Sequence, residues 1–290
     1  DRRTHPPPVF SRRPARRGGP VTPPPETAVE RRPFLARPVE GLGRLLMNFL
    51  SEFGAHLLLL FRTLRSCCWP PFRIRLTFRQ MEIFGFNSIP VVLITGGFTG
   101  AVLALQTFTS FKRFNAETMI GGVIAVTLLR ELGPVLTGLI VAGRAGSAMA
   151  AEIGTMNVTE QIDALNVLAT DPVNYLVVPR FLAGTVMMPM LSTLFSAIGM
   201  VGSYVISVSV LGTNPVTYMR QMWWFIEGED IYTGLIKACV FGVIIAIVGS
   251  YQGFITQGGA EGVGRSTTRA VVLASTFILI FNYILTALLL

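Results

Sequence analysis

Charged side chains are scarce in this sequence. Asp, Glu, Lys and Arg make up 14% of its 290 residues, whereas 51% are hydrophobic, and the mean hydropathy is +0.57. A soluble globular domain typically carries about 25% charged residues, so the composition excludes that class. We therefore expect an all-α integral membrane protein.

Cysteine and histidine are almost missing, with three and two copies respectively. Cys67 and Cys68 are neighbours, which disfavours a bridge between them, and Cys239 lies in an apolar run. His5 and His56 belong to different segments. The sequence therefore predicts no disulfide framework and no metal site.

Enzyme motifs are missing as well. No GxxxxGK[ST] loop occurs, so this chain has no P-loop with which to bind ATP. There is also no HExxH, no GxSxG with triad partners, and no second carboxylate beside Glu131 in the apolar runs. We expect a protein that is not an enzyme and binds no cofactor, with any energy supplied by another protein.

The formal charge of +8 is concentrated in residues 1–38, where nine Arg face three acidic residues among ten Pro. A segment so poor in large apolar residues cannot bury a core, so it predicts a disordered Pro/Arg-rich cytoplasmic tail. Attraction to anionic lipid headgroups is the alternative role, and a transit peptide is disfavoured because Ser is scarce. A nucleic-acid partner is not indicated.

Residues 39–85 precede the long apolar runs. In 39–65 a Leu/Phe-rich face is mixed with charges along the whole length, which favours an amphipathic helix lying in the membrane interface. A first transmembrane span is the alternative. A basic link follows, with Trp69 as an interfacial anchor and three arginines, Arg73, Arg75 and Arg79.

Residues 86–290 predict one membrane domain of five spans, at 86–111, 118–143, 179–211, 231–256 and 270–290. The third exceeds the roughly 30 Å hydrocarbon core and must tilt, kink at Pro189 or protrude. Residues 212–230 predict a loop rich in interfacial aromatics. A Gly-rich loop, 257–269, precedes the last span, with Ser266, Thr267 or Thr268 as the cap of its helix.

The distribution of Arg and Lys predicts the orientation. With the N-terminus cytoplasmic, ten basic residues fall on that side within 39–85, 144–180 and 256–269, and the opposite side holds Lys112, Arg113 and Arg220. The C-terminus is then outside, and the segment 144–173 is cytoplasmic.

Charges near the bilayer midplane mark a candidate site. Arg130 and Glu131 lie about a dozen residues from either polar end of their run, where unpaired charges are costly and default to a functional hypothesis. Adjacent helical positions point about 100° apart, so links to other helices are favoured over a direct pair. Lys237 could complete this network or extend to the interface as an anchor, and a role in fixing helix register is equally open.

Small residues and acids follow along the chain. Two rows at i, i+4 spacing, Gly143/Ser147/Ala151 and Gly146/Ala150/Gly154, predict close helix packing. Beyond them an acidic connecting helix suits contact with a partner through Glu152, Thr155, Glu160 and Asp163.

Several motifs together resemble the MlaE family of lipid ABC transporter permeases that work with MCE-domain proteins. They are RELGP (130–134), GRAGSAMAAEIGTM (143–156), EQIDAL (160–165), Asp171-Pro172, Pro179-Arg180 and GVGRSTTRAVV (262–272). The resemblance covers about residue 40 to the C-terminus. It implies a homodimeric permease in the cell inner membrane, an ATPase-coupling helix at about 150–165, and an outward-facing cavity for phospholipid.

The resemblance also implies partners: a cytoplasmic ABC ATPase dimer that holds ATP and Mg, a small accessory subunit on that ATPase, and a periplasmic ring of MCE-domain proteins. The acyl chains would contact one face of the first span, formed by Leu103, Thr107, Phe111 and Phe114. The alternative is that this face packs on a neighbouring helix.

The function expected is that of a permease subunit that moves phospholipid between the inner membrane and the MCE carrier. Two alternatives are an ion-coupled secondary transporter, motivated by the intramembrane charges, and a membrane-embedded lipid-modifying enzyme. The first usually shows repeated halves, which this sequence lacks, and the second needs a catalytic constellation. The direction of transport and the headgroup preference stay open.

Overall fold

The computed structural model describes residues 36–67, 73–114 and 116–289. The chain forms two compact units, residues 1–50 and 51–290. The first is described from Ala36 to Leu50, the beginning of helix α1 (Ala36–Cys67). The predicted tail, residues 1–38, lies almost entirely outside the described residues.

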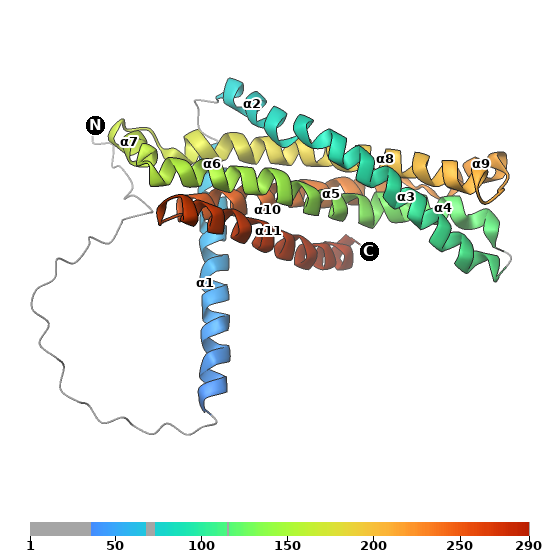
Figure 1. The fold of residues 1–290 in the computed structure, drawn as a ribbon, viewed down its shortest axis with the longest axis horizontal. Helices are drawn as coiled ribbons and strands as arrows, with labels where there is room; N and C mark the ends of the chain where they lie inside the picture. Colours follow the sequence, from blue (N-terminus) through green and yellow to red (C-terminus); the bar gives the residue numbers. More distant parts are fainter. Residues whose placement is uncertain (1–35, 68–72, 115, 290) are drawn as a thin grey trace, which may run out of the picture. The chain divides into compact units, whose positions relative to one another are not determined.

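The described part of the chain is helical (Figure 1). After α1 the helices are α2 (Ile74–Phe84), α3 (Ile89–Lys112), α4 (Ile120–Thr127), α5 (Gly133–Val141), α6 (Ser147–Val158), α7 (Gln161–Val167), α8 (Val178–Ser209), α9 (Pro215–Phe225), α10 (Gly228–Phe254) and α11 (Gly259–Leu289). π-helical turns at Leu128–Leu132, Ala142–Gly146 and Val173–Val177 precede α5, α6 and α8.

Five of the described helical stretches are long and apolar enough to cross a membrane, which confirms the predicted number of spans. They are Ile74–Lys112, Glu117–Val158, Val173–Ser209, Gly228–Phe254 and Gly259–Leu289. The fourth agrees with its predicted bounds. The first, second and fifth extend by about ten residues or more beyond theirs, because helices continue through charged and Gly-rich flanks that predict loops.

Three predicted connections are therefore corrected. The basic link at Arg73–Arg79 forms α2, and the aromatic loop contains α9, in which Tyr218 is buried against Ser203 while Trp223 and Trp224 are exposed. The Gly-rich loop reduces to a turn at Gly258–Gly259, where both residues have positive φ, and α11 begins there. The predicted caps, Ser266, Thr267 and Thr268, consequently lie inside the helix, so that prediction was wrong.

The second span runs from α4 through α6 as one helical stretch with two widened turns. Pro134 follows the first of them and has no N–H with which to continue an α-helical ladder. The π turn accommodates the proline by bonding Gly133 N–H to the carbonyl of Leu128, five residues back. The predicted kink at Pro134 thus takes the form of a π turn.

Helix α8 packs against α3 on one side and α10 on the other. Glycines make both approaches close: a Cβ at Gly100 would lie 1.8 Å from the carbonyl oxygen of Gly199, and one at Gly242 would lie 2.3 Å from that of Gly184. Backbone therefore packs directly on backbone, as small residues allow in membrane helices.

One of the two predicted small-residue rows also makes such a contact. Gly249 of α10 lies against the backbone of Gly146, and Gly253 lies against Ile153 and Gly154. The row Gly146/Ala150/Gly154 thus packs on α10, as predicted. The other row begins at Gly143, whose absent side chain would meet nothing within 4 Å.

Within residues 51–290, the second half of α1 docks through His56. Its imidazole lies 4.3 Å from the ring of Tyr251 and 5.8 Å from that of Phe277 between ring centres, and Nδ1 donates to the carbonyl of Glu52 at 2.6 Å. Burial lowers the pKa of His56 below 6.5, because the charged form loses hydration there.

A depressed histidine pKa stabilises the folded protein above pH 6.5 and loses that contribution as the pH falls through the folded value. Purified protein should therefore melt at a lower temperature at pH 5.5 than at pH 7.5, and His56→Gln should reduce this difference. An equal shift in the variant would contradict the assignment. The same melting curves at pH 7.5 control for any loss of packing in the variant.

Candidate functional site

The candidate site is built on the π turn that holds Arg130 and Glu131. In an α-helix the N–H of residue 134 would bond to the carbonyl of residue 130, but Pro134 has no N–H. The carbonyl oxygen of Arg130 is thereby left for another donor. Lys237 of α10 supplies it, with Nζ at 3.1 Å.

The Lys237 ammonium is fully enclosed, with its side chain 0% exposed. Its three protons have three acceptors: the carbonyl of Arg130, Oε1 of Glu131 at 2.7 Å and Oγ1 of Thr286 at 2.8 Å. The alternative that Lys237 extends to the interface is therefore wrong, and the predicted link to Glu131 is confirmed. Gly234, one turn earlier, lets α10 approach, since a Cβ there would lie 2.2 Å from the carbonyl oxygen of Leu129.

Helix α11 completes the surroundings of Glu131. Nδ2 of Asn282 donates to Oε2 at 3.3 Å, and the hydroxyl of Thr286 lies 3.3 Å from both carboxylate oxygens. Sequence reasoning missed both residues. The signal was present, since Asn282 and Thr286 are polar residues at i, i+4 spacing in an apolar helix.

Arg130 bonds to a different acid. Its Nη1 lies 3.5 Å from Oδ1 of Asp230, in the first turn of α10, and Oδ2 of that residue accepts the N–H of Glu227 at 3.1 Å in a capping box. Arg130 and Glu131 thus link to separate residues, as their divergent directions require. Asp230 was predicted to end a loop, and its role in the network was missed.

These four charges form what we call the charge cluster: Arg130, Glu131, Asp230 and Lys237. Two of its side chains are closed off, Lys237 at 0% and Asp230 at 7% exposure, and two are partly open, Arg130 at 27% and Glu131 at 34%. Both signs are balanced, so the cluster can persist in an apolar bundle. The open guanidinium of Arg130 can donate to an anionic group, and among the described residues no group of metal-binding side chains occurs.

The predicted lipid-contacting residues occupy two environments. Leu103 and Phe111 are partly buried against the main hydrophobic core, and Thr107 lies half-buried between them. Phe114, beyond the end of α3, is 80% exposed. Contact with acyl chains stays a prediction for these four residues.

The acidic segment at the other end of the second span is divided. Helix α6 ends at Val158 and α7 begins at Gln161, with Glu160 between them in a left-handed conformation (φ 61°). The single connecting helix expected over 150–165 is therefore two short helices. Asn157 holds the end of α6 to the turn before α11, because its amide donates to the carbonyls of Phe254 and Thr256 at 3.0 and 2.8 Å.

The four acidic or polar residues predicted to dock a partner differ in their surroundings. Glu152 pairs with Arg180 of α8 at 2.6 Å, and the arginine is 3% exposed, so this contact fixes α6 on α8. Thr155, Glu160 and Asp163 are exposed. The structure thus gives Glu152 a bond within the bundle and leaves the other three on its surface.

Comparison with known proteins adds a further observation. The family model described as Permease MlaE matches residues 77–288. A probable ABC transporter permease protein of Rickettsia typhi is 47% identical over 248 residues, covering 86% of this chain and 96% of that protein.

Two further relatives have more specific names. The intermembrane phospholipid transport system permease protein MlaE of Haemophilus influenzae is 39% identical over 255 residues, covering 84% of this chain and 98% of that protein. Protein TRIGALACTOSYLDIACYLGLYCEROL 1, chloroplastic, of Arabidopsis thaliana is 41% identical over 213 residues, covering 73% of this chain and 61% of that protein.

Proposed function

This chain belongs to the MlaE permease family, and we propose that it conducts phospholipid for an ABC transporter between the inner membrane and a carrier outside it. It is a transport permease and not an enzyme, and it is a multi-pass membrane protein. The sequence has no P-loop of its own. ATP and Mg are therefore assigned to a partner ATPase.

The observation that carries the proposal is the charge cluster inside apolar spans. A phospholipid has an anionic phosphate and two apolar chains, so its passage needs a few polar groups in an otherwise apolar wall. The partly open guanidinium of Arg130 can donate to the phosphate. Asp230 and Glu131 keep the cluster near neutrality, which limits how tightly an anion is held and favours its release.

The assembly proposed is a homodimer of this chain with an ATPase dimer on the cytoplasmic side, a small accessory subunit on the ATPase, and a periplasmic ring of MCE-domain proteins. The N-terminus is cytoplasmic and the C-terminus outside. Segment α6–α7 is then the surface that meets the ATPase. Its bonds to α8 through Glu152 and to the α10–α11 turn through Asn157 support this role, because movement of this segment would be passed to both helices.

Reconstitution of the complex in proteoliposomes tests the function. Fluorescent phospholipid should move between the vesicles and the purified MCE-domain protein when ATP and Mg are present, and a protonophore should have no effect. Transfer that stops with a protonophore and continues without nucleotide would instead identify an ion-coupled transporter. A covalently altered lipid would identify an enzyme.

The docking surface can be tested by charge reversal. Replacing Glu160 and Asp163 together by Lys should reduce stimulation of the ATPase by this permease by about ten-fold or more, because like charges would face each other in the interface. Lipid transfer should fall in parallel. Both side chains are exposed, so the variant should melt at the temperature of the unaltered protein.

The matched control for this experiment is Glu229→Lys. Glu229 is an exposed acid in the first turn of α10, at the end of the bundle away from α7 (Figure 1). Its reversal should leave ATPase stimulation intact. Full stimulation in the Glu160/Asp163 variant would reject the docking surface.

A further inference from the structure

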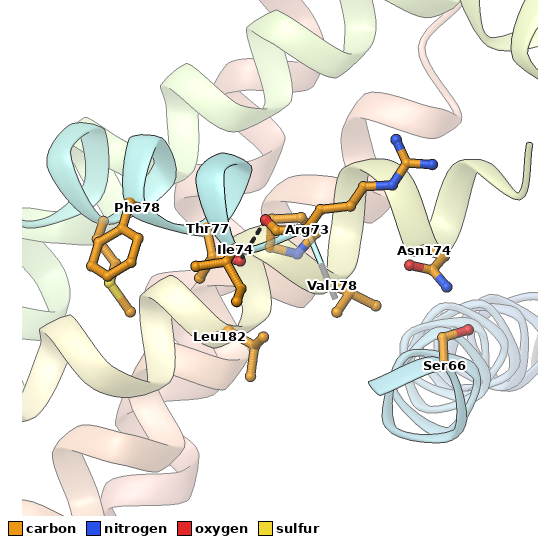
Figure 2. Close-up of a pocket in the computed structure, with 10 residues that line it drawn as sticks. Ser66, Arg73, Ile74, Thr77, Phe78, Asn174, Val178 and Leu182 are labelled. Atoms are coloured by element: carbon orange, nitrogen blue, oxygen red, sulfur yellow. Dashed lines mark hydrogen bonds between the residues drawn. The ribbon is translucent and has the colours of Figure 1, made fainter. Parts of the chain in front are cut away.

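A second amphiphilic feature lies at the other end of the first span, where α2 packs on α8. A cavity of about 310 Å³ opens there (Figure 2). Its walls are the apolar side chains Ile74, Phe78, Met81, Val178, Pro179 and Leu182. Four residues with polar groups complete the lining: Ser66, Arg73, Thr77 and Asn174. None of the four residues of the charge cluster takes part.

The polar and apolar groups of this cavity are separated in space. Figure 2 shows Phe78 at one end and Asn174 and Ser66 at the other, with the guanidinium of Arg73 extending toward Asn174. Such a division matches an amphiphile whose polar head and apolar chain occupy opposite ends of one site. A volume of about 310 Å³ is within the range of ligand sites and fits part of an acyl chain.

Arg73 is held in a posture suited to an anion. Its guanidinium carbon lies 4.4 Å from the centre of the Tyr175 ring. Stacking uses the face of the guanidinium and leaves its N–H edge available for two parallel bonds to a phosphate. Tyr175 therefore positions Arg73 without consuming its donors.

The charge around the cavity favours an anionic ligand. Residues 65–67 and 73–84 contain four arginines and one acid, Glu82. Arg65, Arg75 and Arg79 are exposed near Arg73, and the nearest acid on the α8 side, Asp171, is bonded to Arg62 at 3.1 Å. A zwitterionic headgroup would gain less from this surplus of positive charge.

The depth of the site in a membrane is also suitable. The span Ile74–Lys112 has 39 residues, about 58 Å of helix against roughly 40–45 Å for a bilayer with its headgroups. Its first turns therefore reach the headgroup region. The exposed side chains of α2 are mixed accordingly, since Ile74 and Phe78 are 64% and 67% exposed beside Arg75 and Arg79.

We propose that the α2–α8 cavity binds one anionic phospholipid of the cytoplasmic leaflet as a resident ligand, separate from the lipid that is transported. The phosphate binds at Arg73 with Ser66 and Asn174, and one acyl chain lies along Phe78 and Leu182. The cytoplasmic leaflet follows from the orientation proposed above. The bound lipid would fix α2, the start of the first span, against α8.

Native mass spectrometry of the intact complex tests this site, with no nucleotide or carrier present. The probes are palmitoyl-oleoyl phosphatidylglycerol and phosphatidylcholine with the same chains. Leu182→Trp should fill the apolar end and lower the retained phosphatidylglycerol by about one molecule per chain. Val186→Trp, one turn later on α8 and 47% exposed outside the cavity, is the matched control and should retain the full number.

Arg73→Gln tests the polar end and replaces Leu182→Trp if that variant does not fold. It should lower the affinity for phosphatidylglycerol by about ten-fold and leave phosphatidylcholine unchanged. Water-soluble glycerol phosphate should not compete, since it lacks the chain. Equal retention in the Leu182 and Val186 variants, no preference for phosphatidylglycerol in the unaltered protein, or displacement by glycerol phosphate would each overturn the proposal.

ATP-dependent lipid transfer, measured on the same preparations, separates this proposal from the proposed function. Loss of transfer with normal retention of phosphatidylglycerol would count against the transport role alone. Normal transfer with no selective retention would count against the α2–α8 site alone.

Discussion

Glu131→Gln should lower the free energy of unfolding by about 3 kcal/mol, because it leaves the buried Lys237 ammonium without its counter-charge. The two charged groups lie 2.7 Å apart, and the lysine side chain is 0% exposed. We take the lower end of the usual cost of breaking a buried pair, since the Glu131 side chain is 34% exposed and water can reach it. Denaturant titration in a mild detergent, followed by circular dichroism, would measure the loss.

Two variants make this result specific to the buried pair. The double variant Glu131→Gln with Lys237→Met should regain most of the lost stability, because no charge then remains unpaired. Glu261→Gln breaks an ion pair with Arg265 in which both side chains are more than 70% exposed, so its effect should be within about 0.5 kcal/mol. If Glu131→Gln were no worse than Glu261→Gln, the charge pair would have no structural role.

Gly100→Ala should have an equally large effect through packing alone. The added Cβ would lie 1.8 Å from the carbonyl oxygen of Gly199, so α3 and α8 must separate by more than 1 Å to admit it. Overpacking commonly costs about 1–3 kcal/mol. Here both sides of the contact are backbone and cannot rotate away, so we expect a loss above that range, or no folded protein, as judged by size-exclusion chromatography and thermal melting.

Gly97→Ala is the control on the same helix. Its added Cβ would lie 4.0 Å from the nearest atom, a side-chain carbon of Ile198, which is ordinary van der Waals contact. Alanine is also a better helix former than glycine by about 1 kcal/mol. This variant should be neutral or slightly more stable. Equal damage from both substitutions would show that α3 tolerates no side chain for reasons other than its contact with α8.

Long apolar runs made the membrane-spanning helices predictable, since few other structures can hold so many apolar residues. The link between Glu131 and Lys237 was also predictable, because two opposite charges in an apolar bundle must find partners. Helix ends were less accessible. Gly259–Arg269 predicts a loop by composition, yet it forms the first turns of α11, where packing on α6 and α10 outweighs glycine's low helix propensity.

Partners from distant parts of the chain could not be derived from local patterns. Asp230 precedes its span in the sequence and reaches Arg130 because α10 runs beside the second span. Asn282 and Thr286 meet Glu131 only through the placement of α11. Likewise, Glu152 has the composition of a free surface acid, and its bond to Arg180 depends on how α6 lies on α8. These contacts depend on tertiary arrangement, which one sequence does not encode locally.

The π turn at Leu128–Leu132 contains one residue more than an α-helical turn would need. Deleting one residue there would restore a regular ladder but rotate everything after it by about 100°. The glycines at positions 146 and 154 would then face away from α10, and larger side chains would meet it instead. The extra residue thus sets the angular phase between the half of the span that carries the charges and the half that carries the small-residue row.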